Sequence, residues 1–119
     1  MIPKRIREPT MANIELLQGT LALLILRVLR GGPQHGWGIA QRIHVLSGKT
    51  LSVEEGALYP ALHRMERKGW IKAEWRPSEN NRRAKYYELT RAGRKQLAAE
   101  SEGWKQLTTV MAQVMNAPD

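Results

Sequence analysis

Residues 51–75, LSVEEGALYPALHRMERKGWIKAEW, contain a helical pattern that is followed at once by a strand pattern. Leu58, Leu62 and Met65 recur at the spacing that places side chains on one face of a helix. A glycine ends this pattern, and Trp70 to Arg76 then alternates apolar with charged residues, which is typical of a half-exposed strand. The stretch therefore predicts a helix that leads directly into a β-strand.

The beginning and the middle of this helix carry specific signals. Residues 52–55 form the pattern of a capping box, with Ser52 at the N-cap and a glutamate three residues on, so we expect the helix to open at Ser52. Pro60 lies inside the helical pattern, where its ring crowds the carbonyl of Gly56 and removes one backbone hydrogen bond. We expect a kink or a loosened first half there, not the end of the helix.

A hairpin follows the first strand. Residues 77–81, PSENN, form a turn cluster, in which asparagine accepts the positive φ that glycine would otherwise supply. Ala84 to Leu89, which includes two tyrosines, is the expected return strand.

Two further helices are expected before residue 51. Asn13 is a plausible N-cap for a helix that runs to Arg30 and is apolar on most sides. In so small a domain, such a helix suggests that a second chain covers part of it. Gly36 to Leu46 predicts a second, shorter helix.

A long helix is expected at the end of the chain, capped by Thr90 and lasting to about Met115. Its apolar residues follow a heptad, interrupted at Glu100, at positions Leu97, Trp104, Leu107, Met111 and Val114. Such a seam favours pairing with another helix, the alternative being packing on the chain's own core. With Leu17, Leu21 and Leu24 of the first helix, these residues form the expected dimer interface.

The order of these elements is that of a winged helix-turn-helix followed by a dimerisation helix. The expected fold class is mainly α with a small β-hairpin. We expect residues 1–12 to be a flexible basic arm, 13–90 the DNA-binding domain and 91–116 the C-terminal dimerisation helix. No segment contains the roughly 18 consecutive apolar residues that a membrane-spanning helix needs, so no membrane partner is expected.

The charge of the chain favours an anionic partner. Among 119 residues there are 19 Lys or Arg and 11 Asp or Glu, a net charge of +8. Residues 60–95 alone hold eleven Lys or Arg and four Glu, a net charge of +7. A basic footprint confined to one segment points to nucleic acid before a membrane surface.

Several classes of chemistry are not expected. The chain has no cysteine, which excludes disulfides and thiolate zinc sites and fits a cytoplasmic protein. Its three histidines have no metal-ligand spacing, and neither a catalytic Ser/His/Asp arrangement nor a glycine-rich phosphate loop is found. We therefore expect no metal, no cofactor and no enzymatic activity.

Candidate DNA-binding residues lie on the helix of the opening stretch and on the hairpin. Opposite its apolar stripe, that helix carries Glu55, Ala57, Tyr59, His63, Arg64 and Arg67. A helix fits the major groove, where such side chains reach base edges or phosphates, although a charged face can also be merely solvated. Arg82, Arg83 and Lys85 at the hairpin tip favour DNA binding, because basic tips suit the minor groove or its flanking phosphates.

Trp104 has two interpretations. At the centre of a two-fold interface it would face its own copy, and the two rings would sandwich a flat hydrophobic ligand, which makes Trp104 a candidate effector-pocket residue. The alternative is a tryptophan that fills space in a core.

Four segments, in this order and spacing, resemble the PadR-like transcriptional regulators. They are GTLALLILRVL, GPQHGWGIAQRI, LSVEEGALYPALHRMERKGWIKAEW and NNRRAKYYELTRAGRKQL. The similarity covers about residues 14–110, and the short C-terminal portion is similar to the subfamily with a single C-terminal helix. The resemblance implies a homodimeric winged helix-turn-helix repressor whose third helix enters the major groove.

The resemblance also implies roles for individual residues. It points to Ser52, Glu55, Ala57, Tyr59, Pro60 and His63 on or before the reading helix, and to Arg82, Arg83 and Lys85 on the wing. It implies that the first and last helices form the dimer and that an aromatic residue at the place of Trp104 borders the interface or an effector pocket.

The leading hypothesis is therefore a repressor that binds a near-palindromic double-stranded site and is released by a small flat hydrophobic effector. Two alternatives stay open, because fold does not fix function. One is an adaptor whose basic face docks an acidic protein, and the other is a ligand sensor with only non-specific DNA affinity.

Overall fold

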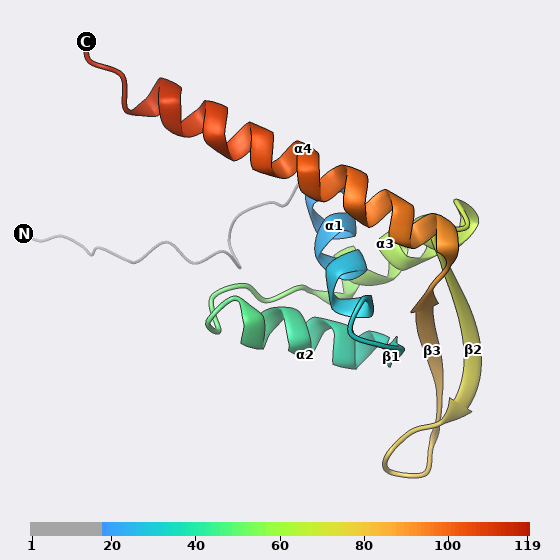
Figure 1. The fold of residues 1–119 in the computed structure, drawn as a ribbon. Helices are drawn as coiled ribbons and strands as arrows, with labels where there is room; N and C mark the ends of the chain where they lie inside the picture. Colours follow the sequence, from blue (N-terminus) through green and yellow to red (C-terminus); the bar gives the residue numbers. More distant parts are fainter. Residues whose placement is uncertain (1–17) are drawn as a thin grey trace, which may run out of the picture.

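The computed structural model describes residues 18–119 (Figure 1). In chain order the elements are α1 (Gln18–Leu29), β1 (Gln34–His35), α2 (Gly36–Leu46), α3 (Glu55–Arg67), β2 (Ile71–Pro77), β3 (Arg83–Leu89) and α4 (Arg91–Met115). The expected fold class, mainly α with a small hairpin, is confirmed. The expected arm at 1–12, the N-cap Asn13 and Leu17 lie outside the described residues.

Helix α1 is the centre of the core. It packs against α2, α3, α4 and β3, and the side chains of Ile25 and Leu26 are 0% exposed. This explains why its sequence is apolar on most sides, since neighbouring elements cover most of its circumference. Leu58, Leu62 and Met65 of α3 complete the core from the stripe predicted by their spacing.

The sheet is antiparallel, with strand order β1-β3-β2. β2 and β3 pair from Ile71 opposite Leu89 to Pro77 opposite Arg83, which gives the expected hairpin. β1 pairs Gln34 with Tyr87 and His35 with Tyr86. Two residues are too few to show a strand period, so sequence patterns did not reveal β1. In Figure 1 the hairpin projects from the helical layer as a wing.

The prediction that Ser52 caps α3 is wrong. The N-cap is Glu54, whose side chain makes no capping hydrogen bond. Residues 51 and 52 are held instead by the end of α2: the Leu51 N–H donates to Ser47 Oγ at 2.9 Å, and the Leu51 carbonyl lies 3.1 Å from His44 Nδ1. Leu51 is also buried in the core. Its burial and these contacts keep residues 51 and 52 out of the helix, which begins at Glu55.

Two other helix predictions are confirmed. α2 spans the expected residues 36–46, and α3 continues through Pro60 to Arg67. Pro60 and Gly56 are both exposed, so water can hydrate the carbonyl that the proline leaves without its helical partner.

Helix α4 starts at the base of the wing. Thr90 is its N-cap: the Thr90 hydroxyl accepts from the Gly93 N–H at 3.0 Å and donates to the Gly69 carbonyl at 2.6 Å. Gly93 lies directly against the carbonyl oxygen of Trp70, where a β-carbon would collide with the backbone. In Figure 1 the second half of α4 projects beyond the rest of the chain. None of the described helices is both long and apolar enough to cross a membrane.

We expect Gly93→Ala to lower the free energy of unfolding by about 2 kcal/mol, because the new methyl group forces α4 away from the Trp70 carbonyl. The matched control is Gly103→Ala on the same helix, where a β-carbon meets open space. That substitution should raise stability by about 0.5–1 kcal/mol through helix propensity. Urea unfolding followed by circular dichroism at one protein concentration measures both. Equal effects of the two substitutions would contradict the close contact at Gly93.

Candidate nucleic-acid interface

The outward face of α3 is polar and aromatic. Tyr59, Pro60, His63 and Arg67 are exposed, whereas Leu58 on the opposite face is 1% exposed. At about 100° per residue, these four outward side chains fall within one sector of the helix. Their functional groups include a phenol, an imidazole and a guanidinium, all able to hydrogen-bond base edges or phosphates.

The start of α3 contributes a second group of exposed residues. Ser52 and Glu55 line a groove of about 260 Å³ between α2 and α3, together with Trp37 and Tyr59. Ser52 is thus close to Glu55, although it precedes the helix and does not cap it. The groove is continuous with the outward face of α3 through Tyr59.

Arg64 lies on a different flank of the same helix. It is half-buried and lines a groove of about 130 Å³ with Gly19 of α1 and Glu100 of α4. Ala57 is exposed, but about 200° of helical rotation separates it from Tyr59. The two predicted DNA contacts Ala57 and Arg64 are therefore not part of the sector that Tyr59 and His63 share.

Of the three basic wing residues predicted to contact DNA, two are exposed and one forms an ion pair. Arg82 and Arg83 are exposed at the turn, where Asn81 has the positive φ of 65° expected of this residue type. The Lys85 ammonium lies 3.7 Å from the Glu66 carboxylate of α3, so Lys85 points back toward the helix. Of the three predicted wing residues, Arg82 and Arg83 thus lie at the tip, whereas Lys85 lies where the wing contacts α3.

A cleft of about 660 Å³ opens between the wing, α3 and the start of α2. Its walls include four of the predicted site residues, Tyr59, Arg82, Arg83 and Lys85. They also include His35, Trp37 and Trp75, which sequence reasoning did not assign to a site. In the alternating pattern of β2, Trp75 is among the apolar residues, which are expected to face the core. In the structure it is 57% exposed.

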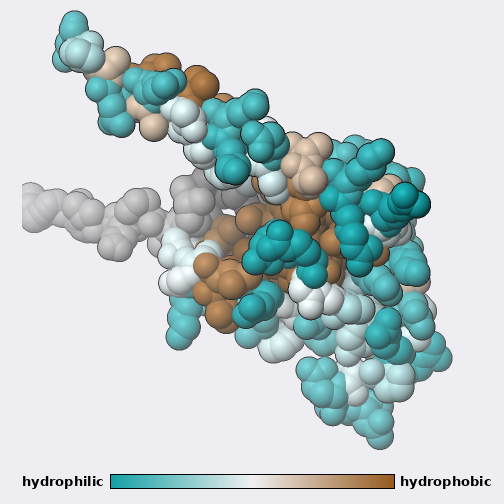
Figure 2. Space-filling model, in the orientation of Figure 1, coloured by the Kyte–Doolittle hydropathy of each residue, from teal (hydrophilic) through white to brown (hydrophobic). Residues whose placement is uncertain are grey.

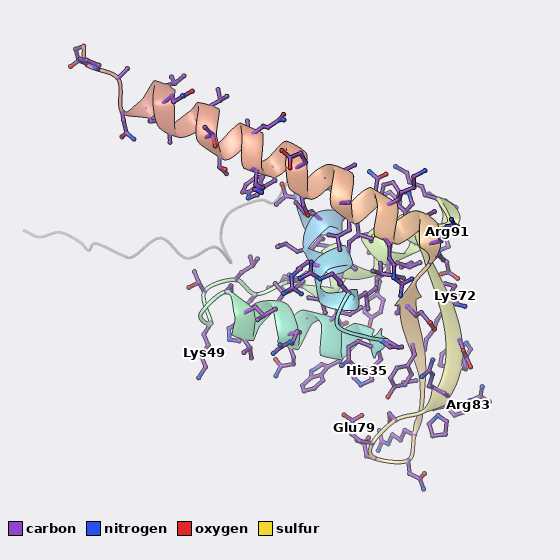
Figure 3. All side chains as sticks on the ribbon, viewed as in Figure 1. His35, Lys49, Lys72, Glu79, Arg83 and Arg91 are labelled. Carbon is purple, nitrogen blue, oxygen red and sulfur yellow. The ribbon has the colours of Figure 1, made fainter. Side chains whose placement is uncertain are left out.

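His35 joins α2 to the turn of the wing. Its Nδ1 accepts from the Gly38 N–H at 3.0 Å and caps α2, so the ring proton lies on Nε2, which is 3.6 Å from the Glu79 carboxylate. Figure 3 labels both residues, His35 at the start of α2 and Glu79 on the wing. A hydrogen bond from its own backbone N–H lowers the pKa of Glu79, and His35 lowers it further. A negative Glu79 therefore faces His35 at neutral pH.

The far half of α4 carries an exposed apolar face, part of which Figure 2 shows in brown on the projecting helix. The exposed apolar side chains are Trp104, Leu107, Val110, Met111, Val114 and Met115. Trp104 is 48% exposed and Met115 75%. Three of the other predicted interface residues are placed differently: Leu21 and Leu97 are buried in the chain's own core, and Leu24 is half-buried.

Among residues 18–119, no three His, Cys, Asp or Glu side chains are grouped so that they could hold a metal ion. Besides Glu79, the Tyr87 phenol is a second titratable group of the cleft wall whose pKa the fold shifts. Burial raises the pKa of Tyr87 above its ordinary value, and the nearby Glu66 carboxylate and Tyr59 raise it further. Tyr87 therefore stays neutral to a higher pH than an exposed tyrosine.

Comparison with known proteins gives one consistent family. The profile of the Transcriptional regulator PadR-like family matches residues 25–99. A PadR family transcription regulator from Clostridium difficile is 31% identical, with a TM-score of 0.70 over 81% of this chain and 98% of its own. A transcriptional regulator from Clostridium thermocellum is 28% identical, with a TM-score of 0.74 over 81% of this chain and 93% of its own. An uncharacterized protein from Lysinibacillus sphaericus is 25% identical over 101 residues, which are 85% of this chain and 93% of the relative.

We expect Tyr87 to make the protein lose stability at alkaline pH. Because its pKa is raised in the folded state, the unfolded chain releases the phenolic proton first, so the free energy of unfolding falls as pH rises through the ordinary tyrosine value. Tyr87→Phe should remove this part of the loss between about pH 8 and about pH 10.5. Urea midpoints at the two pH values measure it, with Tyr86→Phe on the same strand as the control. An unchanged alkaline loss in Tyr87→Phe would refute the assignment.

Proposed function

The chain belongs to the PadR-like family of transcriptional regulators, and on this premise we propose that it is a homodimeric repressor of a near-palindromic DNA site. Members of this family are DNA-binding regulators and not enzymes. Access to chromosomal DNA would require the protein to act in the cytoplasm.

The observation that carries this proposal is the position of the exposed face of α3 beside the basic wing tip. Glu55, Tyr59, Pro60 and His63 would read base edges in the major groove, with Ser52, Ala57 and Arg64 at the margins of that contact. Arg82 and Arg83 would neutralise phosphates at the adjacent minor groove, and Lys85 would fix the wing against α3. The concentration of positive charge in residues 60–95 supports this surface as the one that meets DNA.

The exposed apolar half of α4 supports a dimer. Exposure of side chains such as Trp104, Met111 and Val114 to water is unfavourable in free energy, and a second copy of the helix would cover them. Residues 13–90 would then bind DNA and residues 91–116 would dimerise, with Leu24 of α1 next to the seam. The two reading helices would lie about 34 Å apart, one turn of the duplex.

An effector would act through the same interface. Two Trp104 rings, brought together by the dimer, would hold a flat hydrophobic molecule between them. Such a molecule would release DNA by favouring a dimer in which the spacing of the reading helices does not match the site. Repression would follow from occupation of a promoter by the free dimer.

We expect the double substitution of Arg82 and Arg83 by alanine to weaken DNA binding and to reduce its salt dependence. For each phosphate that is no longer neutralised, the slope of log affinity against log salt should fall by about 1. Fluorescence anisotropy on a duplex selected from genomic DNA, titrated at several salt concentrations, measures both quantities.

The matched control is the double substitution of Lys95 and Lys105 by alanine, which removes the same charge from the exposed surface of α4. It should leave the salt slope nearly unchanged. If both double variants behave like the parent, the wing does not contact DNA, and the adaptor interpretation of the basic face becomes the better one.

We expect Met111→Lys to shift the protein from dimer to monomer, because a charge at the centre of the apolar seam cannot be paired there. Analytical ultracentrifugation at micromolar concentration measures the shift. Thr109→Lys adds the same charge on the opposite side of the heptad and should leave the dimer intact. A parent protein that sediments as a monomer would overturn the dimer proposal.

A further inference from the structure

Three exposed aromatic side chains surround the cleft between the wing, α3 and α2. Trp37 of α2 is 66% exposed, Trp75 of β2 is 57% exposed and Tyr59 of α3 is 45% exposed. They come from three separate elements, and the fold brings them to one hollow. Large apolar side chains gathered on a surface indicate a binding site, because a ligand that covers them is stabilised by the area removed from water.

The walls of this cleft are held in place by contacts on three sides. The Lys85–Glu66 pair, at 3.7 Å, joins the wing to α3, and the His35–Glu79 contact, at 3.6 Å, joins α2 to the wing turn. Gly36 allows the Tyr59 ring to lie against the start of α2, where a β-carbon would be 2.5 Å from the Tyr59 hydroxyl oxygen. A cleft that is already formed loses little conformational entropy when it is filled.

The charge in the cleft selects an anion. Arg82 and Arg83 line it and outnumber its carboxylate, Glu79, which lies 3.6 Å from His35. Lys85 also lines it, but its charge is paired with Glu66. The Arg83 guanidinium lies 5.9 Å from the centre of the Trp75 ring, so cation and aromatic surface are presented side by side. Figure 3 labels Glu79 and Arg83 on the wing. The occupant that this combination fits is a chain with phosphates and apolar sugar faces.

We propose that one sugar–phosphate strand of the duplex lies in this cleft, with Trp37 and Trp75 packed on its deoxyriboses. This rests on the proposed function: if α3 occupies the major groove and the wing the neighbouring minor groove, the strand that separates the two grooves passes between them. That space is the cleft. Trp37 and Trp75 are then positioning residues, which set how deeply the strand sits while Arg82 and Arg83 neutralise its phosphates.

Removal of the two tryptophans should affect DNA affinity and its salt dependence differently from removal of the arginines. An apolar contact with a sugar displaces no condensed cations, so removing it weakens binding without changing the salt slope. A sugar is also the same at every base pair, so affinity should fall equally on the selected site and on its single-base variants. Removing contacts from α3 to base edges would instead weaken binding by amounts that depend on the base.

The test compares Trp75→Ala and Trp37→Ala with the parent on one duplex at several salt concentrations. Each should weaken binding about tenfold, with an unchanged salt slope and the same factor across site variants. Trp75→Phe keeps an aromatic face and should recover most of the affinity. Leu46→Ala, which trims another exposed apolar side chain of α2 outside the cleft, is the matched control and should bind like the parent. Circular dichroism establishes that each variant is folded.

The outcomes separate this inference from the proposed function. If the parent binds no duplex, the proposed function fails and the inference falls with it. If the parent binds DNA and the arginine variant loses salt slope while both tryptophan variants bind like the parent, the proposed function stands and the inference is wrong. If, in addition, benzoate quenches the emission of the parent but not of Trp75→Phe, the cleft belongs to a small aromatic anion instead.

Discussion

The burial of α1 on nearly all sides is the constraint on which the other elements depend. Its residues Ile25 and Leu26 are shielded from water by α2, α3, α4 and β3 together. Each such side chain contributes about 1.5–3 kcal/mol on burial, so the elements that cover α1 are stable only as a set. The reading helix, the wing and the start of α4 therefore share one core.

This shared core also explains why the two halves of α4 differ. The first half is anchored by the buried Leu97 and by the contact between Gly93 and the Trp70 carbonyl. The second half passes beyond the core and has no partner in its own chain among the described residues, so its apolar side chains stay exposed (Figures 1 and 2). A stiff helix fixed at one end is suited to transmit a change at its free end toward the wing. In the proposed function, this is the path from an effector near Trp104 to the spacing of the reading helices.

The agreement between sequence and structure is best where the signal is local. α2 and α4 have the predicted bounds, and the hairpin has its two strands within one residue of the predicted bounds and a positive φ at Asn81. In each case the capping, turn or periodicity signal lies within a few residues of the feature it predicts. The capping box failed at Ser52 although its pattern was complete. Contacts to His44 and Ser47, which lie on the preceding helix and at its end, held Leu51 and Ser52 outside α3.

The candidate site likewise contains some features that local sequence patterns predicted and others that only the packing of the elements produced. The sequence by itself determined the helices, the hairpin and the basic segment that contains Arg82 and Arg83, because propensity, periodicity and charge are properties of neighbouring residues. Only the tertiary structure decided that β1 joins the sheet, that Arg64 lies on the side of α3 that faces α1, and that Trp37 and Trp75 line one cleft. These features depend on contacts between residues far apart in the chain. Such contacts follow from how the elements pack around α1, and no local pattern records them.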